Sequence, residues 1–187
     1  MITLGETTKG MYGAWRLAQG DRGGLAWFDA SPIGAMRSFH AALIAFPLAS
    51  ILLMFDLSRI PVGSSTPTIA IVYVLAFVLD WAAYPVVVHW LAPNMGCQAH
   101  FLRYIPALNW SRVLQLVIML PAGVILASGL SGPVLILPVI LFGATVVYHW
   151  FVAKVALDIS GGKAAGLVAV NFVIGITIGV WAQSLIR

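Results

Sequence analysis

Residues 68–90 read TIAIVYVLAFVLDWAAYPVVVHW and decide the fold class. Asp80 is the single residue in this stretch that is charged at pH 7 with histidine neutral. A helix rises 1.5 Å per residue, so roughly 20 apolar residues cross the roughly 30 Å hydrocarbon core of a bilayer. The stretch therefore predicts a transmembrane helix.

The whole chain shares this composition. Of its 187 residues, 61% are hydrophobic and only 9% are charged, with a mean hydropathy of +0.99. Soluble domains carry about a quarter charged residues, so this chain could not cover a water-facing surface. It is predicted to be an all-α integral membrane protein.

Four more segments have the length and polarity of spans, namely residues 37–54, 111–127, 134–157 and 164–185. With residues 68–90 they predict a single five-helix transmembrane domain over residues 31–187. Residues 92–110 between the second and third spans are more polar, and we expect a loop there with a short interfacial helix.

Residues 1–30 have ordinary polarity and contain aromatic residues between the charges. We interpret them as an interfacial arm on the membrane surface, because Trp and other aromatic side chains favour headgroup depth. The predicted anchors of the whole chain are Trp15, Trp27, Trp90, Trp110 and Trp150.

Basic residues predict the orientation, because they accumulate on the cytoplasmic side of membrane proteins. Two of the ten, Arg59 and Arg187, fall on one side of the predicted spans. The other side carries Lys9, Arg16, Arg22, Arg37, Arg103, Arg112, Lys154 and Lys163. The N-terminus is therefore expected in the cytoplasm and the C-terminus outside, most naturally in a bacterial inner membrane.

The sequence motifs do not indicate a catalytic site, a metal site or a nucleic-acid interface. The four histidines are scattered and Cys97 is the single cysteine, so no metal site, cofactor site or catalytic residue is predicted. A GLSG string at residues 129–132 resembles the nucleophile motif of intramembrane proteases, but a turn between two spans explains it. No basic run favours nucleic-acid binding.

Three polar residues within the spans are expected to meet. Counted from the predicted cytoplasmic side, Asp80 and Asn171 both lie roughly 12 to 15 Å deep, and His149 lies at a comparable level. A carboxylate in hydrocarbon is costly, so Asp80 is expected to hydrogen-bond His149 or Asn171, or else to be protonated or hydrated. The cluster serves either as a structural clamp or as a proton or substrate path.

The fifth predicted span contains Gly175 and Gly179 in a GxxxG pattern, which lets another helix approach closely. The partner is expected to be another span of the same chain, and the alternative is a second copy.

Two stretches resemble the Yip1 domain family. Residues 96–121 (GCQAHFLRYIPALNWSRVLQLVIMLP) are similar to that family's glycine and short polar helix before the third span. Residues 148–170 (YHWFVAKVALDISGGKAAGLVAV) are similar to its junction between the fourth and fifth spans. The order of elements, a cytoplasmic N-terminal segment followed by five spans, also resembles this family.

The resemblance implies a non-enzymatic protein that organises the membrane or partner proteins. Its expected partners are the lipid bilayer and either another membrane protein or a second copy. The alternative is a small transporter or channel component in which Asp80 serves a proton, a cation or a polar solute.

Overall fold

The computed structural model describes residues 4–59 and 63–187, and within those ranges its secondary structure is helical, without strands. Five helical segments are long and apolar enough to cross a membrane: Pro32–Leu57, Thr66–Met95, Gln98–Ala127, Pro133–Leu157 and Gly161–Ile186. The predicted all-α class with five membrane-spanning helices is therefore confirmed.

The first span consists of two helices in line, α2 (Pro32–Ser38) and α3 (Ala41–Leu57). Ser31 caps α2, because its hydroxyl accepts a hydrogen bond from the Gly34 N–H at 2.9 Å. Pro32 then occupies the first turn, where its missing N–H costs nothing.

The polar stretch at residues 92–110 differs from its prediction as a loop. Helix α4 (Thr66–Met95) extends into it and ends at Gly96, whose φ of 71° is the left-handed conformation that glycine adopts readily. After the short turn η2 (Gln98–His100), α5 (Phe101–Ala127) runs without a break. The polar side chains of α5 are accommodated because they bond to neighbouring helices, which hydropathy along one segment does not reveal.

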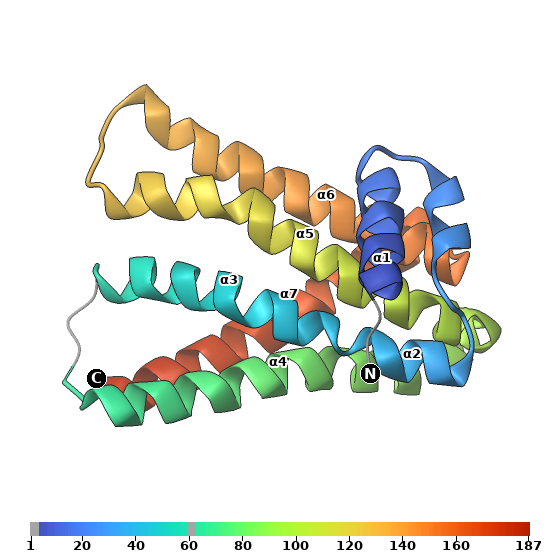
Figure 1. Cartoon of the computed structure of the whole chain (residues 1–187), viewed down its shortest axis with the longest axis horizontal. Coiled ribbons are helices and arrows are strands. Elements are labelled where there is room, and N and C mark those ends of the chain that lie inside the picture. The colour runs from blue at the N-terminus through green and yellow to red at the C-terminus, as the bar shows by residue number, and fades with distance from the viewer. Residues whose placement is uncertain (1–3, 60–62) are drawn as a thin grey trace.

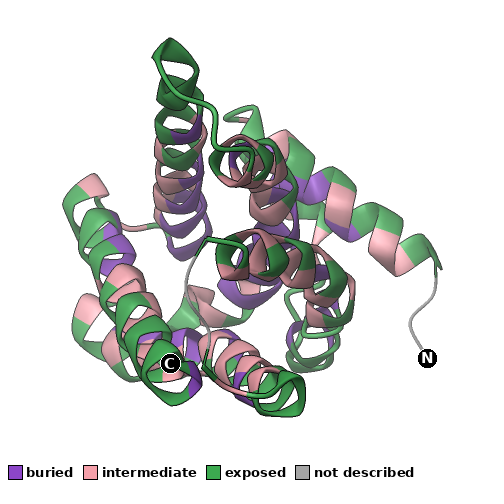
Figure 2. Ribbon diagram, turned by 90° about the vertical axis from the view of Figure 1, so that its left-hand side faces the viewer, coloured by how far each residue is buried: buried purple, intermediate pink, exposed green. Residues whose placement is uncertain are grey.

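The remaining spans are α6 (Ile136–Leu157), preceded by the turn η3 (Pro133–Leu135), and α7 (Gly161–Ile186). Helix α5 packs against α3 and α6, and α7 packs against α6 and α4. The circle closes between α3 and α4, where the Phe46 ring contacts the rings of Tyr73 and Phe77, the latter edge to face. Figure 2, which looks along the bundle, shows the helices around a shared interior.

Burial is concentrated at one end of the bundle, which we call the arm end because the N-terminal helices lie there (Figure 1). The turns between α4 and α5 and between α6 and α7 belong to this end, and Tyr84, Tyr104 and Leu157 are fully buried near it. Towards the opposite end large apolar side chains such as Val139 and Val180 are more than 60% exposed. Lipid is expected to cover them.

The N-terminal arm consists of α1 (Leu4–Ala18) and η1 (Arg22–Trp27), and α1 crosses the bundle steeply over α5 (Figure 1). Gly10 of α1 lies directly on the Trp110 ring, and the Tyr148 hydroxyl of α6 donates to the Ala14 carbonyl at 2.7 Å. The arm is thus docked on the bundle.

Candidate functional site

The site begins with Asp80, in the middle of α4, whose side chain keeps 42% of its surface accessible. One carboxylate oxygen lies 3.7 Å from Nη2 of Arg112 on α5. The Arg112 side chain is only 9% accessible. An ion pair therefore joins two spans, with the guanidinium buried in the bundle and the carboxylate partly accessible.

Arg112 makes further contacts in three directions. Its Nη1 donates to the backbone carbonyl of Asp80 at 3.2 Å, and its Nη2 donates to Oδ1 of Asn171 on α7 at 3.4 Å. The guanidinium also lies 5.3 Å from the centroid of the Trp81 ring, within range of a cation–π contact. This one side chain consequently connects α5 to both α4 and α7.

His149 of α6 joins the site through a tyrosine. Its Nε2 lies 3.2 Å from the Tyr84 hydroxyl, and that hydroxyl lies 2.9 Å from the hydroxyl of Tyr104 on α5. All three side chains are buried. The result is a hydrogen-bonded chain across α6, α4 and α5, one helical turn from Asp80.

The predicted cluster is therefore brought to one place, but with different connections. Asp80, His149 and Asn171 line the same cavity. Within the described residues Asp80 pairs with Arg112, and the expected direct hydrogen bond from Asp80 to His149 or Asn171 does not form. The guanidinium, which neutralises a carboxylate better than an imidazole or an amide can, takes that place.

The cavity has a volume of about 350 Å³ and receives side chains from all five spans. The lining residues include Ala49 of α3 and Gln115 of α5. The Nε2 atom of Gln115 is buried and has no hydrogen-bond partner within residues 4–59 and 63–187. Buried amide groups are normally bonded, so this donor is left unsatisfied by the described residues although its side chain lines the cavity.

Arg112, Gln115 and Tyr84 are the residues that the sequence interpretation missed. Arg112 is eleven residues beyond the start of α5 at Phe101, whereas the sequence places it at the cytoplasmic end of the predicted third span. A signal did exist, because Asn109, Arg112 and Gln115 recur at intervals of three and so share one helix face.

The predicted packing role of Gly175 and Gly179 within the chain does not hold in the described residues. A Cβ added at either position would meet open space within 4 Å. The GxxxG pattern of α7 is therefore not used for close helix packing among the described residues, and it leaves room for another helix to approach.

The tryptophan anchors divide into two groups. Trp15, Trp27 and Trp90 are 53%, 40% and 75% exposed, so they are free to contact lipid headgroups. Trp150 is half-buried, and its Nε1 donates to the Gly161 carbonyl. Trp110 is only 6% exposed because α1 covers it, so its prediction as an anchor is wrong.

Tyr84 provides a direct test of the polar interior. Tyr84→Phe removes the hydroxyl that bonds both Tyr104 and His149 and is expected to lower the free energy of unfolding by about 1 to 3 kcal/mol. The measurement is unfolding by titration with sodium dodecyl sulfate in mixed micelles. Tyr73→Phe is the control, because its hydroxyl makes only a 3.5 Å contact with Ser50. Equal effects of both variants would contradict the network.

Comparison of the chain with protein-family models, with curated proteins and with solved structures finds no match.

Proposed function

We propose that the chain is an integral membrane protein that binds a small polar solute in its central cavity and carries that solute through the bundle. The observation that carries the proposal is the cavity itself, which is lined by polar side chains from α4, α5, α6 and α7. Polar and ionisable residues within spans are costly, and those facing a cavity commonly mark a solute path.

The unpartnered Gln115 donor argues against a role in packing alone. A clamp between helices gains stability only when its polar groups are satisfied, and a buried orphan donor costs about 1 to 3 kcal/mol. An apolar residue would avoid this cost. Retaining Gln115 is understandable if its Nε2 bonds a solute for part of the transport cycle.

The chemistry of the lining defines the class of solute. Arg112 and Gln115 offer N–H donors, while Asp80 offers a carboxylate. A small molecule with hydrogen-bond acceptors, such as an inorganic or organic anion or an amino acid, fits this set. We further propose that the chain is not an enzyme, because the guanidinium and the amides are not nucleophiles and the His149 ring is engaged by Tyr84.

The test is uptake of radiolabelled phosphate, succinate and glycine into liposomes containing the purified protein. Gln115→Leu is expected to reduce uptake at least about tenfold while raising the free energy of unfolding by about 1 kcal/mol, because an unsatisfied donor is removed. Asp80→Asn is expected to abolish uptake as well.

Gln98→Leu is the matched control for this experiment, since Gln98 lies in the exposed turn η2. Uptake unaffected by Gln115→Leu, or no uptake of any of the three solutes, would contradict the proposal.

For the orientation, we propose an N-terminus in the cytoplasm and a C-terminus outside, in a bacterial inner membrane. With Arg112 inside α5, seven basic residues remain at the arm end and two, Arg59 and Arg187, at the opposite end. The bias that supports this orientation is therefore retained. A C-terminal alkaline phosphatase fusion is expected to be active and a C-terminal green fluorescent protein fusion dark. The opposite pattern would contradict the orientation.

A second candidate is a scaffold that organises partner proteins, as the resemblance to the Yip1 domain family implies. The open space beside Gly175 and Gly179 favours it, because small residues without a close neighbour suit association with another span. Stable co-purification of a partner or a second copy without solute uptake would support this candidate over transport.

A further inference from the structure

A second and larger cavity lies outside the central site, between the arm and the first span. Its volume is about 670 Å³. Its walls come from α1, η1, α2, the segment between η1 and α2, and α5, and include Glu6, Lys9, Trp27, Asp29, Arg37 and Trp110. None of these residues takes part in the central cavity. We call it the arm pocket.

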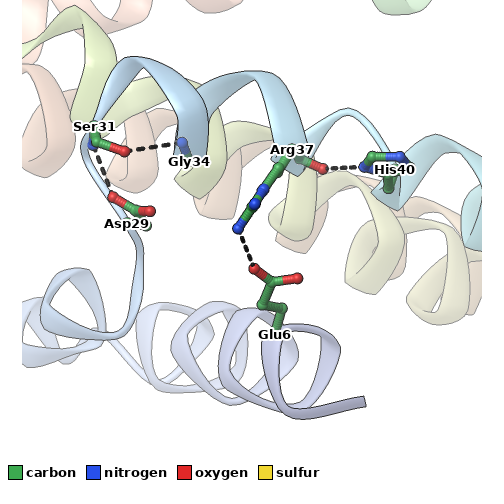
Figure 3. A network of polar contacts seen from close by, with 6 residues as sticks. All are labelled: Glu6, Asp29, Ser31, Gly34, Arg37 and His40. Carbon is green, nitrogen blue, oxygen red and sulfur yellow. Dashed lines mark hydrogen bonds and ion pairs between the residues drawn. The ribbon is translucent and has the colours of Figure 1, made fainter. Parts of the chain in front are cut away.

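Charges of both signs face each other across the arm pocket. Figure 3 shows Arg37 pointing from α2 towards Glu6 on α1, with Nη1 3.0 Å from Oε1. Asp29 lies on the same side of α2, and its Oδ1 accepts the Ser31 N–H at 2.9 Å (Figure 3). With Lys9 on α1, the pocket has two cations, two carboxylates and no net charge.

Asp29 is a permanent charge at neutral pH. The Ser31 N–H and hydroxyl, together with the nearby Arg37, hold the pKa of Asp29 below its usual value. Only one carboxylate oxygen accepts the Ser31 N–H, and the side chain is close to the surface of the protein. A carboxylate is thus available to a cationic group that enters the pocket.

The surroundings of the arm pocket are those of a membrane surface. On α2 the apolar side chains of Ile33 and Met36 are 63% and 76% exposed, and α3 begins its apolar run at Ala41. Trp27, which lines the pocket, is 40% exposed. Tryptophan favours the depth of lipid headgroups, so the charged pocket and the apolar side chains match the two parts of a lipid.

We propose that the arm pocket binds the headgroup of a zwitterionic aminophospholipid. The phosphodiester lies between Lys9 and Arg37, which donate N–H groups to its oxygens. The ammonium donates to Asp29, and the acyl chains leave the pocket past the side of α2 that carries Ile33. A purely anionic headgroup would meet the repulsion of Asp29 and Glu6, and a choline headgroup lacks the N–H donors that a carboxylate bonds.

The experiment measures retained lipid by native mass spectrometry of the purified chain in mixed micelles. Phosphatidylethanolamine, phosphatidylcholine and phosphatidylglycerol with identical acyl chains are supplied at equal concentration. The wild-type chain is expected to retain phosphatidylethanolamine in preference to the other two. Asp29→Asn keeps an oxygen that can accept the Ser31 N–H but removes the charge, so it is expected to weaken phosphatidylethanolamine binding about tenfold.

Two matched variants control for charge and position. Asp158→Asn makes the same change in the exposed turn after α6, where the backbone φ of 54° suits asparagine. Lys9→Gln is paired with Lys163→Gln, whose native ammonium bonds the Met95 carbonyl away from the pocket. Asp29→Asn and Lys9→Gln should weaken binding while both controls retain it. Equal retention of the three lipids, or an unchanged preference in Asp29→Asn, would overturn the proposal.

Discussion

Arg112→Met is expected to destabilise the bundle and to abolish solute uptake. The substitution keeps an unbranched apolar stem but leaves Asp80 without its cation and Asn171 without its donor. Breaking a fully buried ion pair costs about 3 to 5 kcal/mol, and the accessibility of Asp80 lowers the expected loss to about 2 to 3 kcal/mol. Unfolding in mixed micelles and uptake into liposomes measure the two effects.

Arg103→Met is the control for this prediction. Arg103 donates to the carbonyls of Ala156 and Val155 near the end of α6, without a carboxylate partner among the described residues. The substitution removes hydrogen bonds but leaves no carboxylate without its cation. We therefore expect the free energy of unfolding to fall by about 1 kcal/mol and solute uptake to stay normal. An Arg112→Met chain as stable and active as Arg103→Met would mean that Arg112 does not hold the site together.

Gly10→Ala is expected to displace the arm from the bundle. An added Cβ would overlap the ring of Trp110, which is held between α1 and the bundle and cannot withdraw easily. Overpacking of this kind lowers the free energy of unfolding by about 1 to 3 kcal/mol. Faster proteolysis at residues 19–31, between α1 and α2, and a change in tryptophan fluorescence are the expected readouts. The spans should remain inserted, because their apolar length is unchanged.

Gly143→Ala is the matched control on α6, where an added Cβ meets no atom within 4 Å. Alanine is the better helix former, so this variant should be neutral or slightly stabilising. If both variants behave alike, Gly10 does not mark a close contact between α1 and α5.

The sequence was sufficient for the five spans because each signal is local. Apolar runs of sufficient length predict membrane helices whatever their neighbours are, and Ser31 and Pro32 mark the start of α2 through contacts within one turn. Because helical rise is constant, counting residues along each span also predicts that Asp80, His149 and Asn171 lie at the same depth.

The sequence was insufficient where a partner decides the outcome. An arginine near the start of a span has the same local pattern at a membrane surface and inside a bundle, so the sequence places Arg112 with the cytoplasmic charges. Trp110 was expected at the headgroups because nothing local shows that α1 covers it. Gly175 and Gly179 permit close packing, but which surface uses them depends on the arrangement of all five helices.

The polar residues of the spans meet around Arg112 inside the bundle, with Asp80 as its ionic partner. A double-mutant cycle measures this contact from the unfolding free energies of wild type, Asp80→Asn, Arg112→Met and the double variant. We expect a coupling free energy of about 1 to 3 kcal/mol, so that the double variant loses less stability than the two single variants lose together. If the two single losses instead add to within about 0.5 kcal/mol, the two side chains do not interact and Arg112 does not organise the site.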